Sequence, residues 1–305
     1  MTQTMTHVPQ IFDTPLVHAH MRRAFAMGPA DFLLTRAVED MADRLDVIMR
    51  PFPAVLDLAT PLPLAGAVLA GHERQITRAA FVPTGADDVV LSDETLPFAP
   101  ESFDLCVSLL ALQSINDLPG FLVHIRRVLR PDGLFLGCLL GGQSLMEVRH
   151  VLARAEEEIR GGVSPRVAPF ADVRDMGGLL QRAGFTLPVS DSDRLIVRYD
   201  HAFAVFRDLR AMGATNALTA RSKMALRRDI VMRAAELYHE LYRDEDGRVR
   251  LTFELIWVSG WAAHESQQKP LKPGSAQMRL ADALGVVEGQ GPQRGENNDG
   301  SAPAK

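Results

Sequence analysis

The first fifty residues carry apolar side chains at helical spacing. Within residues 16–50 these side chains recur every three or four positions, which predicts helix. Pro51 ends that pattern, and residues 54–58 (AVLDL) form a short apolar run that is typical of a buried strand. The pattern therefore predicts an N-terminal helical segment over residues 1–50, followed by the first strand of a sheet.

The middle of the chain alternates between strand and helix. Residues 75–82 and 89–91 have strand character, but too few residues separate them for a crossover helix, so an eroded sheet edge is expected there. The clearest pattern is a buried strand at 103–109, a helix at 118–129 and a strand at 134–140. Strand, helix and strand in this order predict a parallel sheet with right-handed crossovers, and hence an α/β fold.

A further helix and an interrupted hairpin are predicted towards the C-terminus. Ser144 and Glu147 have the spacing of a capping box, so a helix is expected to begin there. Residues 200–246 are helical in pattern and lie between two strand-like segments, 189–199 and 251–258. The helical pair is therefore expected to interrupt a hairpin and to cover the sheet as a lid.

The last strand alternates between two faces. Phe253, Leu255 and Trp257 fall on one face, and Glu254, Ile256 and Val258 fall on the other. Beyond it the chain becomes polar and rich in glycine, proline and asparagine. These patterns divide the chain into an N-terminal helical segment (1–50), an α/β core (51–199), a helical lid (200–246), a last strand that completes the core (247–268) and a largely disordered polar tail (269–305).

Composition narrows the classes of function. The chain has 305 residues and a formal net charge of −5, so the basic excess typical of nucleic-acid binding is missing. No apolar run approaches the roughly 18–20 residues that span a bilayer, and no secretory signal is apparent; a peripheral membrane contact stays open. Cys106 and Cys138 lie in apolar runs, which predicts buried thiols in a reducing, cytoplasmic setting. The spacing of histidines and cysteines predicts no metal site.

Two central motifs resemble a known family. Residues 96–105 (LPFAPESFDL) and 127–135 (RVLRPDGLF) are similar, in order and spacing, to segments of class I S-adenosylmethionine (SAM) methyltransferases, in particular the type 11 methyltransferase domain. The resemblance implies a doubly wound, mostly parallel sheet of the Rossmann-like type. It also implies SAM as the cofactor.

Four further motifs narrow the resemblance. They look like the methyltransferase-like assembly factors of respiratory complex I, a group related to the malonyl-carrier-protein methyltransferases of biotin synthesis. Mitochondrial members of that group are associated with arginine hydroxylation on an iron–sulfur subunit of complex I, so such a subunit is an implied protein partner. The resemblance is weakest between residues 59 and 90. Its motifs are NDLP (116–119), GGQSL (141–145), GGVSP (161–165) and WAAHESQ (261–267).

The part of the chain that should form the SAM pocket departs from the family. Asp57 matches the acid that closes the first strand, but Ala59, Pro61 and Pro63 stand where glycines are usual. Each replacement adds atoms where the ligand passes, and each proline removes an N–H donor. Residues 75–82 contain no carboxylate for the ribose hydroxyls. The glycine-rich turn and the ribose-binding acid, two features that a SAM pocket requires, are therefore altered.

The resemblance still implies cofactor contacts for five residues, namely Asp57, Ala59, Asp93, Glu94 and Gln113. Each of the polar ones also has a structural interpretation. Asp57 is equally consistent with a loop cap, Asp93 with a turn residue, and Gln113 with a satisfied polar group at a strand end. No catalytic residue is identified, because methyl transfer depends mainly on the positioning of the two reactants.

Three hypotheses follow. The first is a SAM-dependent methyltransferase-like protein that acts on a protein or carrier-bound substrate and is linked to complex I assembly. The second is a non-catalytic assembly factor with a degenerate SAM site. The third, a protein arginine hydroxylase, depends on the resemblance alone.

Overall fold

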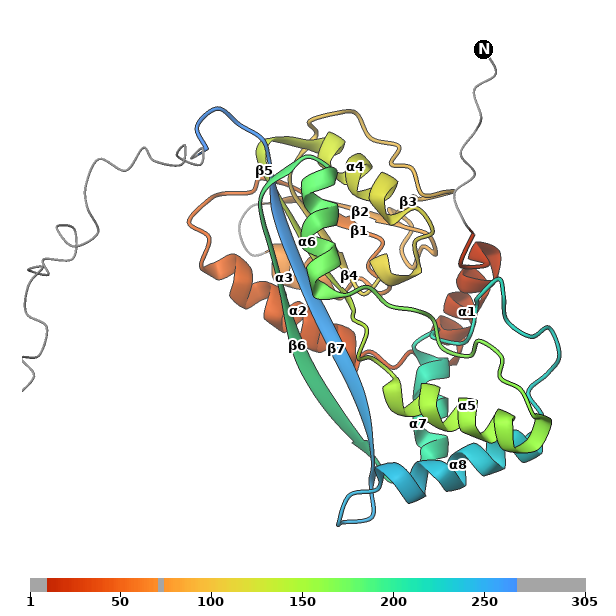
Figure 1. Cartoon of the computed structure of the whole chain (residues 1–305). Coiled ribbons are helices and arrows are strands. Elements are labelled where there is room, and N and C mark those ends of the chain that lie inside the picture. Colours follow the sequence, from red (N-terminus) through yellow and green to blue (C-terminus); the bar gives the residue numbers. More distant parts are fainter. Residues whose placement is uncertain (1–9, 71–73, 268–305) are drawn as a thin grey trace, which may run out of the picture. The chain divides into compact units, whose positions relative to one another are not determined.

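The computed structural model describes residues 10–70 and 74–267 (Figure 1). Helices and strands alternate through most of this range, with two helices in front of the first strand and two more between the last two strands. The helices are α1 (Thr14–Met27), α2 (Phe32–Asp46), α3 (Leu64–Leu69), α4 (Leu118–Val128), α5 (Met146–Arg160), α6 (Val173–Arg182), α7 (Ala202–Ala211), α8 (Arg228–Tyr242) and the 3-10 helix η2 (Leu112–Ser114). The strands are β1 (Ala54–Leu58), β2 (Gln75–Ala80), β3 (Val89–Val90), β4 (Phe103–Leu109), β5 (Leu129–Leu140), β6 (Phe185–Tyr199) and β7 (Val249–Ala262).

The strands form one mixed, mostly parallel sheet in the order β3-β2-β1-β4-β5-β7-β6. Strands β1 to β5 run parallel to one another, and β7 runs antiparallel to both β5 and β6. The predicted α/β fold with a mostly parallel sheet is confirmed. The eroded edge is confirmed as well, because β3 has only two residues and residues 81–88 between β2 and β3 contain no helix.

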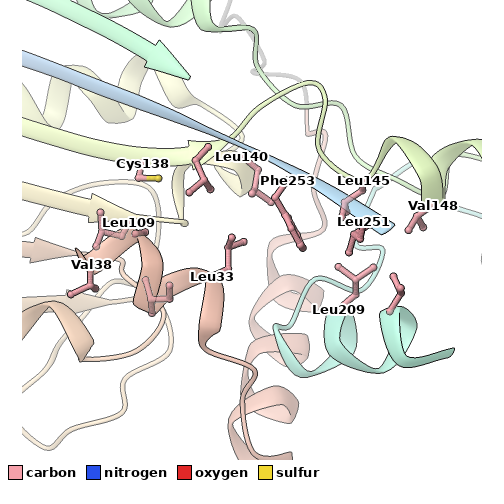
Figure 2. Packing of buried hydrophobic residues seen from close by; sticks show 14 of the residues in the cluster. Leu33, Val38, Leu109, Cys138, Leu140, Leu145, Val148, Leu209, Leu251 and Phe253 are labelled. Atoms are coloured by element: carbon pink, nitrogen blue, oxygen red, sulfur yellow. The ribbon is translucent and has the colours of Figure 1, made fainter. Parts of the chain in front are cut away.

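Hydrophobic cores cover both faces of the sheet. On β7 the predicted alternation is confirmed: Phe253, Leu255 and Trp257 belong to one cluster, and Ile256 and Val258 belong to the other. The first cluster brings in α2, α5, α7 and α8, and Figure 2 shows part of it, from Leu33 on α2 to Leu209 on α7. The second cluster brings in α4 and α6. The doubly wound arrangement therefore follows from strands that are apolar on both faces.

Both cysteines are free and buried, as predicted. Cys106 on β4 and Cys138 on β5 lie in the two different clusters, so they are separated by the sheet. Burial raises the pKa of each thiol above its ordinary value. Neither is a thiolate at neutral pH, and their role is packing.

The predicted single helical segment at 16–50 consists of two helices. Gly28 ends α1 with a φ of 88°, a conformation that glycine adopts without strain, and Pro29 follows it. The amide of Ala30 then donates to the carbonyl of Ala211 at 3.3 Å. The break therefore lets α1 pack beside α7, away from α2 (Figure 1).

The predicted capping box at the start of α5 is wrong. Ser144 is buried, and its hydroxyl accepts from the amide of Glu254 at 3.0 Å and lies 3.2 Å from the carbonyl of the same residue. The Glu147 carboxylate accepts from the amide and the hydroxyl of Thr252. Both side chains are committed to β7 and not to the N-terminus of α5, so they fasten this helix to the sheet.

Helices α7 and α8 interrupt the final hairpin, as predicted. Strands β6 and β7 pair from Phe185 opposite Ala262 to Tyr199 opposite Val249, with a register shift between Thr186 and Val189, and β6 forms an edge of the sheet. Both helices are shorter than the sequence pattern predicts, and residues 213–227 between them contain no helix. The polar tail predicted at 269–305 lies outside the described residues. Within residues 10–70 and 74–267, no helix has the length and apolar character needed to cross a membrane.

Candidate functional site

The carboxyl edge of the parallel strands contains the main cavity of the described structure. In this sheet the connections run outward in one direction after β1 and in the other after β4, so the switch point lies between these two strands. A cavity of about 580 Å³, here called the large cavity, opens there. It extends from Pro61 and Leu110 at the strand ends to α1, α5, α7 and the 213–218 segment. Its volume is within the roughly 300–1,000 Å³ that small-molecule pockets occupy.

A second cavity of about 40 Å³, the small cavity, adjoins the first. The two share Val17, Met21, Pro61, Leu110 and Ser114. The small cavity is what remains of the space between α1, the loop after β1 and the end of β2.

The loop after β1 is held by the sheet. Ala59 has a φ of 58°, a left-handed conformation that is strained for a residue with a Cβ atom, and its amide donates to the carbonyl of Ala79 at 2.7 Å. The Thr60 hydroxyl accepts from the amide of Leu109 at 3.3 Å. Pro61 has no N–H group. The amide of Ala59 is therefore committed to β2, and position 61 has no amide to offer.

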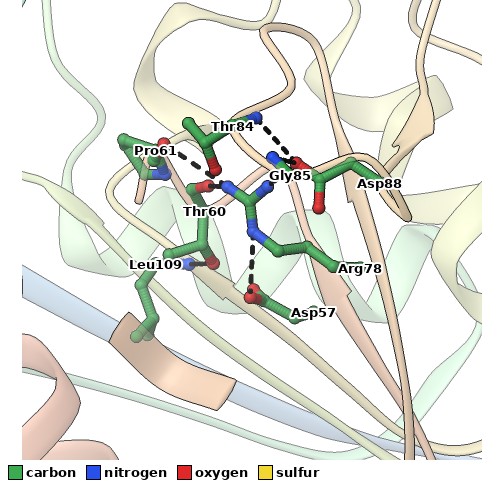
Figure 3. Close-up of polar contacts among 8 residues, drawn as sticks. All are labelled: Asp57, Thr60, Pro61, Arg78, Thr84, Gly85, Asp88 and Leu109. Carbon is green, nitrogen blue, oxygen red and sulfur yellow. Dashed lines mark hydrogen bonds and ion pairs between the residues drawn. The ribbon is translucent and has the colours of Figure 1, made fainter. Parts of the chain in front are cut away.

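Arg78 on β2 fills the space beside this loop (Figure 3). Its Nη2 donates to the carbonyls of Thr60 at 2.8 Å and Pro61 at 3.4 Å, and its Nη1 donates to the Asp88 carboxylate. Its Nε lies 3.6 Å from a carboxylate oxygen of Asp57, the residue opposite it in the strand register. One guanidinium group therefore binds the loop after β1 and the segment that follows β2.

Asp57 serves this internal network. It is only 1% exposed and lines neither cavity. Burial raises its pKa to about 6, and the Thr60 side chain and the neighbouring Arg78 guanidinium oppose that shift. The predicted role of Asp57 as a cofactor ligand stays a prediction, because the structure gives its side chain an internal position.

Asp93 and Glu94 lie in the segment between β3 and β4. Asp93 is exposed and lines neither cavity; hydrogen bonds from the hydroxyl and amide of Thr95 lower its pKa. Glu94 lines the small cavity, but its carboxylate accepts from the amides of Asn116 and Asp117, both at 2.7 Å. Asp93 thus holds a local turn, which agrees with its turn interpretation, whereas Glu94 binds the backbone that leads into α4.

Gln113 lies in η2 and lines the large cavity. Its Nε2 donates to the carbonyl of Leu110 at 2.6 Å, and its Oε1 is buried without a hydrogen-bond partner. Of the five predicted site residues, Ala59 and Glu94 therefore meet at the small cavity and Gln113 reaches the large one. Asp57 and Asp93 reach neither.

An aromatic stack closes the small cavity from the α1 side. The centroids of the His18 and Phe81 rings lie 5.3 Å apart, with an angle of 23° between the ring planes. Burial lowers the pKa of His18, so the imidazole is neutral at pH 7. Phe81 directly follows β2, where the family presents an acid to the ribose. Nothing in the sequence indicated that His18, Phe81 or Arg78 would lie at this site, apart from the presence of a cation, Arg78, in a strand-like run without an acid.

These residues do not fit SAM. The ribose hydroxyls would meet Phe81 where a carboxylate is required, and the loop carbonyls at Thr60 and Pro61 already accept from Arg78. A space of about 40 Å³ holds little more than a water molecule, far less than an adenosine. In the described part of the chain, no group of three or more His, Cys, Asp or Glu side chains is placed to hold a metal ion.

Comparison with known proteins agrees with this architecture. Residues 68–137 match the family described as "Methyltransferase domain". The YcgJ protein of Bacillus subtilis has a similar solved structure, with a TM-score of 0.51 and 12% identity; the match covers 75% of this chain and 99% of that chain. The fold is therefore a Rossmann-like α/β fold of the class I methyltransferase type.

Two groups of relatives are more specific. A Danio rerio protein named "Arginine-hydroxylase NDUFAF5, mitochondrial" is 38% identical over 267 residues, which cover 83% of this chain and 82% of that protein. The malonyl-(acyl-carrier protein) O-methyltransferase of Laribacter hongkongensis (strain HLHK9) is 32% identical over 286 residues, which cover 86% of this chain and 94% of that protein. The chain belongs to the methyltransferase-like family that includes these proteins.

Proposed function

We propose that this methyltransferase-like protein takes part in the assembly of respiratory complex I by binding a protein or carrier-bound substrate at the large cavity. The main support for this proposal is the contrast between the two sides of the switch point. The large cavity is open, whereas the β1–β2 side, where the family binds its cofactor, is filled by the chain's own side chains. The relatives named arginine hydroxylase are consistent with a protein partner. The motif resemblance to complex I assembly factors makes a complex I iron–sulfur subunit the candidate. The O-methyltransferase relatives support a carrier-bound one.

A cytoplasmic location is part of the proposal. It is supported by Cys106 and Cys138, which are buried, unpaired and separated by the sheet, as suits a reducing compartment.

SAM-dependent transfer is the second candidate, and one observation favours it. The two cavities share α1 residues Val17 and Met21, so a displacement of α1 would join them. The binding role is supported better, since Arg78 and Phe81 come from the sheet side and would stay in place when α1 moves.

Two measurements on the full-length protein test the proposal. Calorimetric titration and thermal melting with SAM and with S-adenosylhomocysteine are expected to show no binding at millimolar concentration; submillimolar binding would favour the transferase instead. Affinity capture from the native host is expected to recover a complex I iron–sulfur subunit. Capture without any complex I subunit would remove the assembly role.

The arginine-hydroxylase alternative has its own readout. Mass spectrometry of the captured subunit, from cells with and without this gene, would show whether an arginine modification depends on the protein. A modification that disappears with the gene would replace the binding role by catalysis.

A further inference from the structure

The large cavity is apolar along most of its length. Val148 and Leu152 of α5 face it from one side, and Phe206 and Leu209 of α7 line it as well. These two helices belong to one hydrophobic cluster with the sheet, so the cavity is a gap inside a packed region. Such a gap favours an apolar ligand, because binding removes apolar surface on both partners from water.

Two arginines line the same cavity, and their surroundings differ. Arg166 is already neutralised: it donates twice to the buried Glu156 carboxylate. Although burial would raise the pKa of Glu156, the hydrogen bonds from Arg166 and from the amide of Ser164 lower it, so this carboxylate is ionised. Arg210 on α7 has no comparable partner, and no ion pair of Arg210 exists among the residues the structure describes.

Two further arginines, Arg23 and Arg221, lie near Arg210. Arg23 of α1 donates to the hydroxyl of Thr215, a residue that lines the cavity, at 2.8 Å. The Nε of Arg23 is buried without a hydrogen-bond partner, and burial together with the nearby Arg210 lowers its pKa. Arg221 also lies near, but it pairs with Asp13 at 2.9 Å. Arg23 and Arg210 therefore leave two guanidinium groups without a carboxylate within residues 10–70 and 74–267.

His20 adds no charge to this end of the cavity. Its Nδ1 lies 3.1 Å from the carbonyl of Thr215. Burial lowers its pKa, and the neighbouring Arg23, Arg221 and Arg210 act in the same direction. The imidazole is therefore neutral at pH 7, and this end of the cavity keeps a surplus of positive charge.

We propose that the large cavity binds an amphiphile with a single apolar chain and an anionic head, the head at Arg210 and Arg23 and the chain between α5 and α7. This rests on the proposed function in that both use the same cavity as a binding site. A guanidinium group binds carboxylate and phosphate by paired, charge-assisted hydrogen bonds, so a free fatty acid and a lipid phosphate share the required chemistry. No carboxylate occurs among the described residues that line the cavity, so none of them opposes the positive charge of Arg210.

Calorimetric titration of the full-length protein tests this with four probes of equal chain length, each below its micelle concentration. Dodecanoate and dodecyl phosphate are expected to bind, and dodecan-1-ol about tenfold more weakly. Dodecylamine is expected to show no binding. Tighter binding of the phosphate would point to a phospholipid-like head, and tighter binding of the carboxylate to a fatty acid. Absence of binding by both anions overturns the proposal.

Matched variants distinguish the contribution of the Arg210 charge to probe affinity from the contribution of the apolar cavity. Arg210→Gln is expected to weaken both anions about tenfold and to leave the alcohol unchanged. Arg207→Gln removes an exposed arginine of the same helix that does not line the cavity, and it is expected to change nothing. Leu226→Trp fills the cavity from the loop before α8 and should abolish binding of all probes.

Two controls make failure informative. Thermal melting shows whether each variant is folded, and the salt dependence of dodecanoate affinity reports the charge contribution in the unmodified protein. Equal affinity for dodecanoate and dodecan-1-ol, or an Arg210→Gln variant that binds anions normally, overturns the anionic-head assignment. Recovery of complex I subunits by a protein that binds no amphiphile would refute this inference and leave the proposed function standing.

Discussion

The two sides of the switch point differ in what fills them. On the β1–β2 side, Arg78 and the His18–Phe81 stack occupy the space that a cofactor would need and leave about 40 Å³. On the β4–β5 side, α5 and α7 line a cavity of about 580 Å³. The fold has thus filled one half of the crevice at its switch point with its own side chains and kept the other half open.

The largest expected effect on stability comes from removing Arg78, the side chain that fills the β1–β2 side of the switch point. Arg78→Ala is expected to lower the free energy of unfolding at pH 7 by about 3–5 kcal/mol, because Asp57 and Asp88 are left as buried or half-buried charges without their cation. Denaturant titration measures the loss. Arg36→Ala is the control: this arginine is 47% exposed and pairs with Asp40 on the same helix, so a loss of less than about 1 kcal/mol is expected. Equal losses for the two variants would show that Arg78 is not structural.

The pH dependence of stability gives the next largest effect. The folded-state pKa of Asp57 is raised from 3.8 to about 6, so the folded protein binds more protons than the unfolded chain between these values. Stability from this group is therefore fully present below about pH 4 and is lost as the pH rises through 6, by about 2–3 kcal/mol in total. Asp57→Asn is expected to remove this fall in a series of unfolding titrations from pH 4 to 7.

A matched variant sharpens that experiment. Asp93 is exposed, and hydrogen bonds from Thr95 lower its pKa, so its contribution is lost only as the pH falls below the ordinary range. Asp93→Asn should leave the fall between pH 4 and 6 in place. A fall that persists in Asp57→Asn, or vanishes in Asp93→Asn, would assign the titration to another group.

A smaller loss is expected on the open side, where polar contacts fasten α5 to β7. Ser144→Ala leaves the amide of Glu254 without its acceptor in a buried region, which is expected to reduce the free energy of unfolding by about 1–3 kcal/mol. Ser102→Ala removes an exposed hydroxyl that donates to the carbonyl of Ala99, and a change below about 0.5 kcal/mol is expected. Thermal or denaturant unfolding compares the two. A similar small effect of both would mean that water replaces the Ser144 hydroxyl.

Some of this comparison was available from the sequence. The order of strand, helix and strand over residues 103–140 predicted a parallel sheet, and the alternation over residues 253–258 predicted a strand, because burial leaves a pattern in the residues themselves. The replacement of glycines by Ala59 and Pro61 predicted an altered turn after β1. These features depend on short stretches of chain.

Other features depend on partners that are distant in sequence. Arg78 meets Asp57 only through the register of β1 and β2, and Ser144 meets Glu254 only after β7 has joined the sheet. The spacing of Ser144 and Glu147 predicted a local cap, but the tertiary hydrogen bonds to β7 prevailed over it. The large cavity combines α1, α5, α7 and the strand ends, so no single segment indicates its position or its charge.

The smallest expected effect on stability concerns backbone strain at Ala59 in the loop after β1. Replacement by glycine is expected to have opposite signs at this alanine and at an alanine in the helix that follows. Ala59 has a φ of 58°, where a Cβ atom is unfavourable by about 1–2 kcal/mol, whereas glycine adds about 0.4–1 kcal/mol of unfolded-state entropy. Ala59→Gly is therefore expected to stabilise the protein by about 0.5 kcal/mol. Ala65→Gly, within the short helix α3, is expected to destabilise it by about 1 kcal/mol. Precise thermal unfolding resolves both signs. If Ala59→Gly destabilises as well, the loop is held by contacts of its methyl group and the closed side is packed more tightly than its backbone strain implies.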